Sequence, residues 1–107
     1  VSVSLERLGN LALAEGNLPE ARRLFSDALA VAQRLSESDP GNASWQRDLV
    51  VSYFKLGGLE EQSGNGAAAK SNFLKCLAVL RGMKQSHMHF DSGLAAAHKK
   101  LSDRFDA

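Results

Sequence analysis

The side chains best suited to chemistry lie in one loop near the end of the chain, where His87, His89 and Asp91 stand close together. Imidazole and carboxylate groups are ligands of several transition metals. The loop has no second cluster, however, and a metal site needs three or four protein ligands. His98 lies only a short helix away. We interpret these residues as a solvated loop and predict no metal and no cofactor, with zinc binding as the alternative.

Catalysis requires a nucleophile or an acid–base group held beside a partner in a pocket. The serines lie mostly at predicted turns or on helix faces, and the chain has no glycine-rich loop of the phosphate-binding form. Glu60 and Glu61 are adjacent on a predicted helix and therefore point to different sides. We predict that the protein is not an enzyme and has no catalytic residues.

The charge balance of the chain bears on its partners. Its 107 residues include 13 Lys or Arg and 12 Asp or Glu, for a net charge of +1. Proteins that bind nucleic acid usually concentrate basic charge on one face, and spanning a bilayer takes roughly 18 or more apolar residues in one run. We therefore expect a protein or peptide as the partner, and neither nucleic acid nor a membrane.

The chain repeats itself with a period of 48 residues. From Val3/Val51 to Val31/Val79 the two copies align without a gap and are identical at 12 of 29 positions, where composition alone gives roughly two or three. Self-similarity at a period of about 20 to 50 residues marks a repeat architecture, in which each unit buries its apolar face against its neighbour.

Helical spacing of the apolar residues predicts five helices, over about residues 1–15, 18–37, 43–63 and 67–84 and from about 91 onward. Gly16 ends the first helix, and Asn17 caps the second with Glu20 completing a capping box. Gly9 and Gly57 in helix interiors suggest that a neighbouring backbone needs the space. The predicted inward positions include Leu8, Gly9, Ala21, Leu24, Phe25, Leu49, Leu56, Gly57, Ala69, Phe73, Leu77 and Leu80.

Cys76 is the only cysteine and cannot form a disulfide within the chain. A free thiol is compatible with a reducing compartment, and we expect the protein in the cytoplasm. In the repeat register Cys76 corresponds to Ala28, which predicts a small buried side chain. A reactive thiol is the alternative.

The repeated residues resemble the tetratricopeptide repeat, which sets Leu-Gly and a medium residue on one helix and Ala with Phe on the next. Its matches are Leu5, Leu8, Gly9, Ala12, Ala21 and Phe25 in the first copy and Tyr53, Leu56, Gly57, Ala69 and Phe73 in the second, where Glu60 is a misfit. The usual repeat has about 34 residues, so a 48-residue period is similar to a long-repeat variant.

This resemblance implies a single all-α domain over residues 1–107, an α-α superhelix of two antiparallel helical hairpins closed by a capping helix. The hairpins would span about 1–42 and 43–90, and the cap about 91–107. The final helix is either a true cap or the first half of a third repeat. We also expect the chain to be a piece of a longer protein, because its first residue already lies within a helical pattern.

In this family the first helix of each pair lines a concave groove that binds peptides or partner proteins. The corresponding candidate residues are Glu6, Asn10, Leu13, Val51, Phe54, Lys55 and Lys100. One version of the groove clamps a C-terminal carboxylate, and here its positions carry Glu6, Asn10, Lys55, Ala96 and Lys100. Glu6 has the wrong charge and Ala96 has none, which argues against such a clamp.

Phe54 is the most informative candidate, because its counterpart in the first repeat is Glu6. Phe54 is either an exposed anchor beside Val51 or a core residue packed on a neighbouring helix. We predict a protein-interaction module or scaffold that binds a peptide or partner protein in the groove. The alternative is a structural or self-association segment of a larger solenoid, including a possible homodimer.

Overall fold

Five α-helices make up most of the computed structural model, which describes residues 2–105 and the side chains of residues 4–105. They are α1 (Ser2–Ala14), α2 (Leu18–Ser38), α3 (Ala43–Gln62), α4 (Gly66–Gln85) and α5 (Ser92–Phe105). The described residues contain no strand, so the predicted all-α fold is confirmed. Each predicted helix bound between residues 2 and 105 lies within one residue of the observed one. The predicted start at Val1 and the last two residues lie outside the described part.

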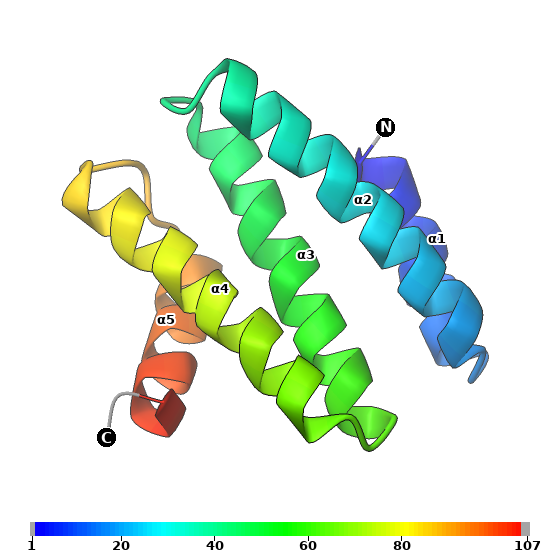
Figure 1. The fold of residues 1–107 in the computed structure, drawn as a ribbon. Coiled ribbons are helices and arrows are strands. Elements are labelled where there is room, and N and C mark those ends of the chain that lie inside the picture. Colours follow the sequence, from blue (N-terminus) through cyan, green and yellow to red (C-terminus); the bar gives the residue numbers. More distant parts are fainter. Residues whose placement is uncertain (1, 106–107) are drawn as a thin grey trace.

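The helices form two antiparallel hairpins, α1 with α2 and α3 with α4, followed by α5 (Figure 1). Each helix packs against the next one along the chain. In the view of Figure 1, α1 lies behind α2 and α5 lies behind α4. Helices joined by short turns are expected to become antiparallel neighbours, and the two tight turns after α1 and α3 have this effect.

The turns after α1 and α3 have the same hydrogen bonds. Gly16 and Gly64 adopt positive φ angles of 77° and 84°. The next residue in each turn, Asn17 or Asn65, donates its backbone N–H to a carbonyl five residues back, at 2.9 and 2.8 Å. This is the Schellman arrangement, which satisfies carbonyls at the end of a helix and tolerates glycine best.

Only half of the predicted capping box forms at the start of α2. Asn17 Oδ1 accepts a hydrogen bond from the backbone N–H of Glu20 at 3.3 Å. The Glu20 carboxylate pairs with Arg23 on the exposed side of the helix. The Glu20 carboxylate therefore forms an ion pair one turn along the helix instead of the second bond of the capping box.

Gly9 and Gly57 leave room for a phenyl ring, so the expectation of a neighbouring backbone is wrong. A Cβ atom on Gly9 would lie 2.8 to 3.0 Å from ring atoms of Phe25, and one on Gly57 would lie 2.6 to 2.9 Å from ring atoms of Phe73. Both rings are almost fully buried. The Gly and Phe of each repeat therefore form one contact that joins the two helices of a hairpin.

The core consists of two clusters. One lies among α1, α2 and α3 around Phe25, and the other lies among α3, α4 and α5 around Phe73 and Leu80. Cys76 is fully buried in the second cluster, and its thiol donates to the Val50 carbonyl at 3.4 Å. Burial raises the pKa of the Cys76 thiol to about 12. The prediction of a small buried residue is therefore confirmed, and the thiol stays protonated near neutral pH.

Leu8 does not hold the stack together, contrary to the prediction from its spacing. Leu8 and Leu11 are 52% and 57% exposed, whereas their counterparts in the second repeat, Leu56 and Leu59, are 6% and 1% exposed. Leu56 and Leu59 pack with residues of α2. The physical reason is that no described helix occupies the corresponding place beside α1.

Candidate functional site: a groove between α3 and α5

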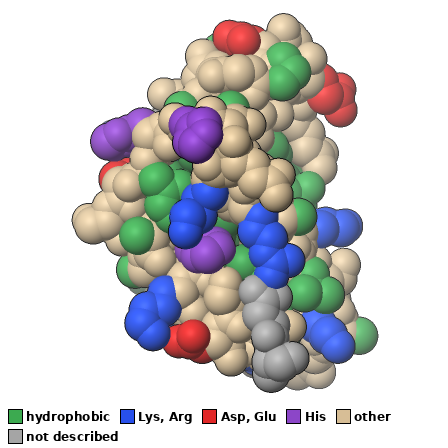
Figure 2. All heavy atoms as spheres, turned by 90° about the vertical axis from the view of Figure 1, so that its left-hand side faces the viewer, with side chains coloured by type: hydrophobic (Ala, Val, Ile, Leu, Met, Phe, Trp, Pro, Cys, Tyr) green, Lys and Arg blue, Asp and Glu red, His purple; other side chains and the backbone are tan. Residues whose placement is uncertain are grey.

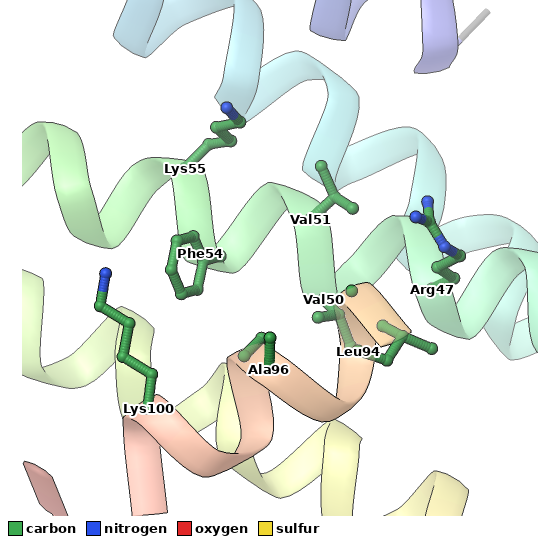
Figure 3. A pocket seen from close by; sticks show the side chains of 10 residues that line it. Arg47, Val50, Val51, Phe54, Lys55, Leu94, Ala96 and Lys100 are labelled. Carbon is green, nitrogen blue, oxygen red and sulfur yellow. The ribbon is translucent and has the colours of Figure 1, made fainter. Parts of the chain in front are cut away.

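A groove of about 470 Å³ runs between α3 and α5. This volume is in the range of about 300 to 1,000 Å³ that is usual for small-ligand pockets. Its walls are formed by Arg47, Val50, Val51, Phe54 and Lys55 of α3 and by Gly93, Leu94, Ala96, Ala97 and Lys100 of α5 (Figure 3). Apolar side chains lie in its middle, and the three basic side chains, Arg47, Lys55 and Lys100, lie at its rim (Figure 3).

Phe54 connects the groove to the core. Its ring is partly buried and meets the buried ring of Phe73 edge to face, with centroids 5.8 Å apart. Lys100 Nζ lies 5.7 Å from the centroid of Phe54, within the range of a cation–π contact. The two interpretations of Phe54 thus both describe part of its environment, because one edge packs in the core and the remaining surface lines the groove.

The position of α5 beside α3 is fixed by Asp91. Its Oδ1 accepts the backbone N–H of Leu94 at 2.8 Å and so caps the start of α5. Its Oδ2 accepts the Arg47 Nε–H at 2.9 Å. At the other end, Arg104 pairs with Glu61 of α3, and its guanidinium carbon lies 5.3 Å from the centroid of Phe73. An ion pair near each end of α5 therefore joins this helix to α3.

Charge is unevenly distributed around the site. Lys55 and Lys100 place positive charge beside the apolar floor, and Arg47 is paired with Asp91. Glu6 on α1 is partly buried, and its Oε1 has no hydrogen-bond partner among the described residues. Burial raises the pKa of Glu6, as does the neighbouring Asp48, while Arg47 and Lys55 lower it. Glu6 of α1 thus lies near both acidic and basic side chains of α3.

Four of the seven candidate residues meet in the groove: Val51, Phe54, Lys55 and Lys100. The three candidates on α1 do not line it. Asn10 is exposed, Leu13 packs partly against the core around Phe25, and Glu6 lies near charged residues of α3.

Sequence reasoning missed other residues of this groove. Arg47 precedes Val51 and Phe54 at helical spacing, so periodicity could have identified it. At a spacing of 45 residues Leu94 corresponds to Leu49, which is a predicted inward position. It is buried, and it forms the wall nearest the start of α5. The pairing of Arg47 with Asp91 has no local signal, because the two residues are 44 positions apart.

The histidines near α5 have other neighbours. The rings of Phe90 and His98 meet edge to face, with centroids 6.1 Å apart. Asp91 already accepts hydrogen bonds from Arg47 and from the backbone N–H of Leu94 at the start of α5. On the face formed by α5 and the end of α4, His side chains lie among Lys and Arg side chains (Figure 2). Within residues 2–105, no group of three or more His, Cys, Asp or Glu is arranged to hold a metal ion.

The Asp91 contacts make the docking of α5 sensitive to acid. The hydrogen bond from Leu94 N–H, and then the bond from Arg47, lower the pKa of Asp91 below its ordinary value of 3.8. A carboxyl group with a lowered folded-state pKa stabilises the fold above about pH 4, and this contribution is lost as the pH falls through the folded value. Asp91→Ala is therefore expected to lower the stability of the protein at pH 7.

Urea unfolding of the wild type and Asp91→Ala at pH 7 and at about pH 2.5 measures this effect, and the difference between the two proteins should shrink at the lower pH. Asp91→Asn is the matched control, because asparagine is as good a helix cap as aspartate but carries no charge. The free energy of unfolding of Asp91→Asn at pH 7 should lie between those of the wild type and Asp91→Ala. An equal deficit of Asp91→Ala at both pH values would contradict a role for the charge.

Comparisons with family models, with curated proteins and with solved structures find no match to this chain. The resemblance to the tetratricopeptide repeat therefore stays a prediction, which rests on the repeated Leu-Gly and Ala/Phe positions. None of the described helices combines the length and the apolar character needed to cross a membrane.

Proposed function

We propose that the protein is an interaction module that binds a peptide segment of a partner protein in the groove between α3 and α5. The observation that carries the proposal is the meeting of Val51, Phe54, Lys55 and Lys100, from two helices far apart in sequence, around one apolar floor. The sequence predicts all four as partner-binding residues. No catalytic step and no cofactor are part of this proposal.

The groove favours a ligand with an apolar side chain next to an acidic one. Burying one large apolar side chain is worth about 1.5 to 3 kcal/mol, whereas an exposed ion pair adds about 0.2 to 1 kcal/mol. The apolar contact with Val51 and Phe54 therefore provides most of the affinity. Lys55 and Lys100 orient the segment and speed its association.

We also propose that the module acts in the cytoplasm. The free thiol of Cys76 supports this location, because it is fully buried and has no disulfide partner in the sequence.

Selection of phage-displayed 12-residue peptides on the immobilised protein tests the binding proposal. Selected peptides are expected to share an apolar residue close to an Asp or Glu. Phe54→Ala should weaken the best of them at least about tenfold by calorimetry, as expected for a residue at the centre of an interface. Lys100→Glu should weaken it severalfold, because it replaces an attractive charge by a repulsive one.

Leu74→Ala is the matched control, because Leu74 is an exposed apolar residue of α4 that does not line the groove. It should leave the affinity unchanged. The proposal fails if the selected peptides carry no acidic residue, or if Phe54→Ala and Lys100→Glu bind them as tightly as the wild type does while remaining folded.

A further inference from the structure

Lys55 has neighbours in two different helix pairs. On one side it lines the groove between α3 and α5, together with Phe54 and Lys100. Figure 3 shows its side chain at the edge of the groove that lies away from α5. On the other side Lys55 lies near Glu6 of α1 and acts on its charge. A change on α1 can therefore reach the groove through this one side chain.

The internal repeat relates Glu6 and Lys55 to a contact inside the groove. Glu6 corresponds to Phe54 at the period of 48 residues, and Lys55 corresponds to Lys100 at the spacing of 45 residues. Between α3 and α5, Lys100 Nζ lies 5.7 Å from the centroid of the Phe54 ring. Between α1 and α3, the equivalent lysine lies near a carboxylate instead of a phenyl ring.

The surroundings of Glu6 leave its carboxylate poorly stabilised. The side chain is partly buried, and its Oε1 is enclosed without a hydrogen-bond partner among the described residues. Burial, and then Asp48, raises the pKa of Glu6. Arg47 and Lys55 lower it. Because an enclosed carboxylate oxygen without a hydrogen bond is costly, the charge of Glu6 depends on these two α3 cations.

We propose that Glu6 lowers the affinity of the α3–α5 groove for acidic peptides, because it competes with them for the positive charge of Lys55. This inference rests on peptide binding in the groove, the function proposed above. Arg47 is already held by Asp91, to which it donates its Nε–H at 2.9 Å. An acidic residue of a peptide therefore gains less from Lys55, and binding depends more on the apolar contact with Phe54.

Calorimetry with the best phage-selected 12-residue peptide measures the competition at pH 8, far above the ordinary pKa of a glutamate side chain. Glu6→Gln removes the charge and keeps the size of the side chain. It should tighten binding of the peptide about two- to fivefold, the range expected for one partly exposed charge pair. Glu15→Gln is the matched control, because it removes the same charge from an exposed position at the other end of α1. It should leave the affinity unchanged.

Two further measurements separate competition from a change in the fold. In the background of Lys55→Met, Glu6→Gln should no longer tighten the peptide, because the shared positive charge is absent. A peptide whose acidic residue is replaced by its amide should bind the wild type and Glu6→Gln equally well. Circular dichroism checks that each variant remains folded.

Equal binding of the acidic peptide by the wild type and Glu6→Gln would overturn this inference. A gain in affinity that persists in Lys55→Met, or with the amide peptide, would also overturn it. In these cases the proposed function still stands, provided that Phe54→Ala weakens the peptide. If Phe54→Ala has no effect, or if the selection gives no peptide that binds, peptide binding in the groove is wrong and the competition by Glu6 is wrong with it.

Discussion

Phe73→Ala is expected to lower the free energy of unfolding by about 3 to 5 kcal/mol, the usual cost of truncating a buried phenyl ring. Phe73 is 4% exposed, and its ring packs edge to face on the ring of Phe54. The centroids of the Phe73 and Phe105 rings are 5.9 Å apart. Phe73 therefore joins α3, α4 and α5 at one point. Urea unfolding followed by circular dichroism measures the loss.

Phe105→Ala is the matched control for this prediction. Phe105 is only partly buried and packs against the edge of the same cluster. Its truncation should cost clearly less, about 1 to 2 kcal/mol, because less apolar surface returns to water. Equal costs at the two positions would contradict the central place of Phe73 in the core.

Two adjacent glycines of α3 are expected to respond to alanine with opposite signs. A Cβ atom at position 57 would lie within 2.9 Å of three atoms of the Phe73 ring, whereas one at position 58 would meet nothing within 4 Å. Gly57→Ala should therefore destabilise the protein by about 1 to 3 kcal/mol, as overpacking does. Gly58→Ala should stabilise it by up to about 1 kcal/mol, since alanine is the better helix former.

Thermal and urea unfolding of the two variants under the same conditions test this pair. Both substitutions change the same residue type within one helix, so the intrinsic helix propensity gained is the same. Stabilisation by Gly57→Ala would show that the Phe73 ring moves aside at little cost. The conclusion that this contact joins α3 and α4 would then be wrong.

The internal repeat explains why so much of the fold could be predicted from the sequence. Gly57 and Phe73 recur as Gly9 and Phe25, so both partners of one packing contact are visible as pairs in the alignment of the chain with itself. The turns at Gly16 and Gly64 recur in the same way, because both need a positive φ angle. Contacts that are made twice leave a signal in a single sequence.

Features that occur once could not be predicted in this way. Leu8 follows the same pattern as Leu56, but its burial depends on whether another helix lies beside it, and no local signal contains that information. The groove was only partly predicted for a similar reason. The loop before α5 departs from the repeat, so the pairing of Arg47 with Asp91 and the place of Lys100 beside Phe54 have no counterpart in the first copy.

The most direct test of peptide binding in the α3–α5 groove is a map of amide chemical shifts in the ¹⁵N-labelled protein as a selected 12-residue peptide is added. Binding in the groove predicts that the largest shifts occur at Val51, Phe54, Ala96 and Lys100, and that they disappear when the acidic residue of the peptide and Phe54 are replaced by alanine. Shifts concentrated on the exposed sides of α2 and α4, with those four residues unchanged, would contradict it.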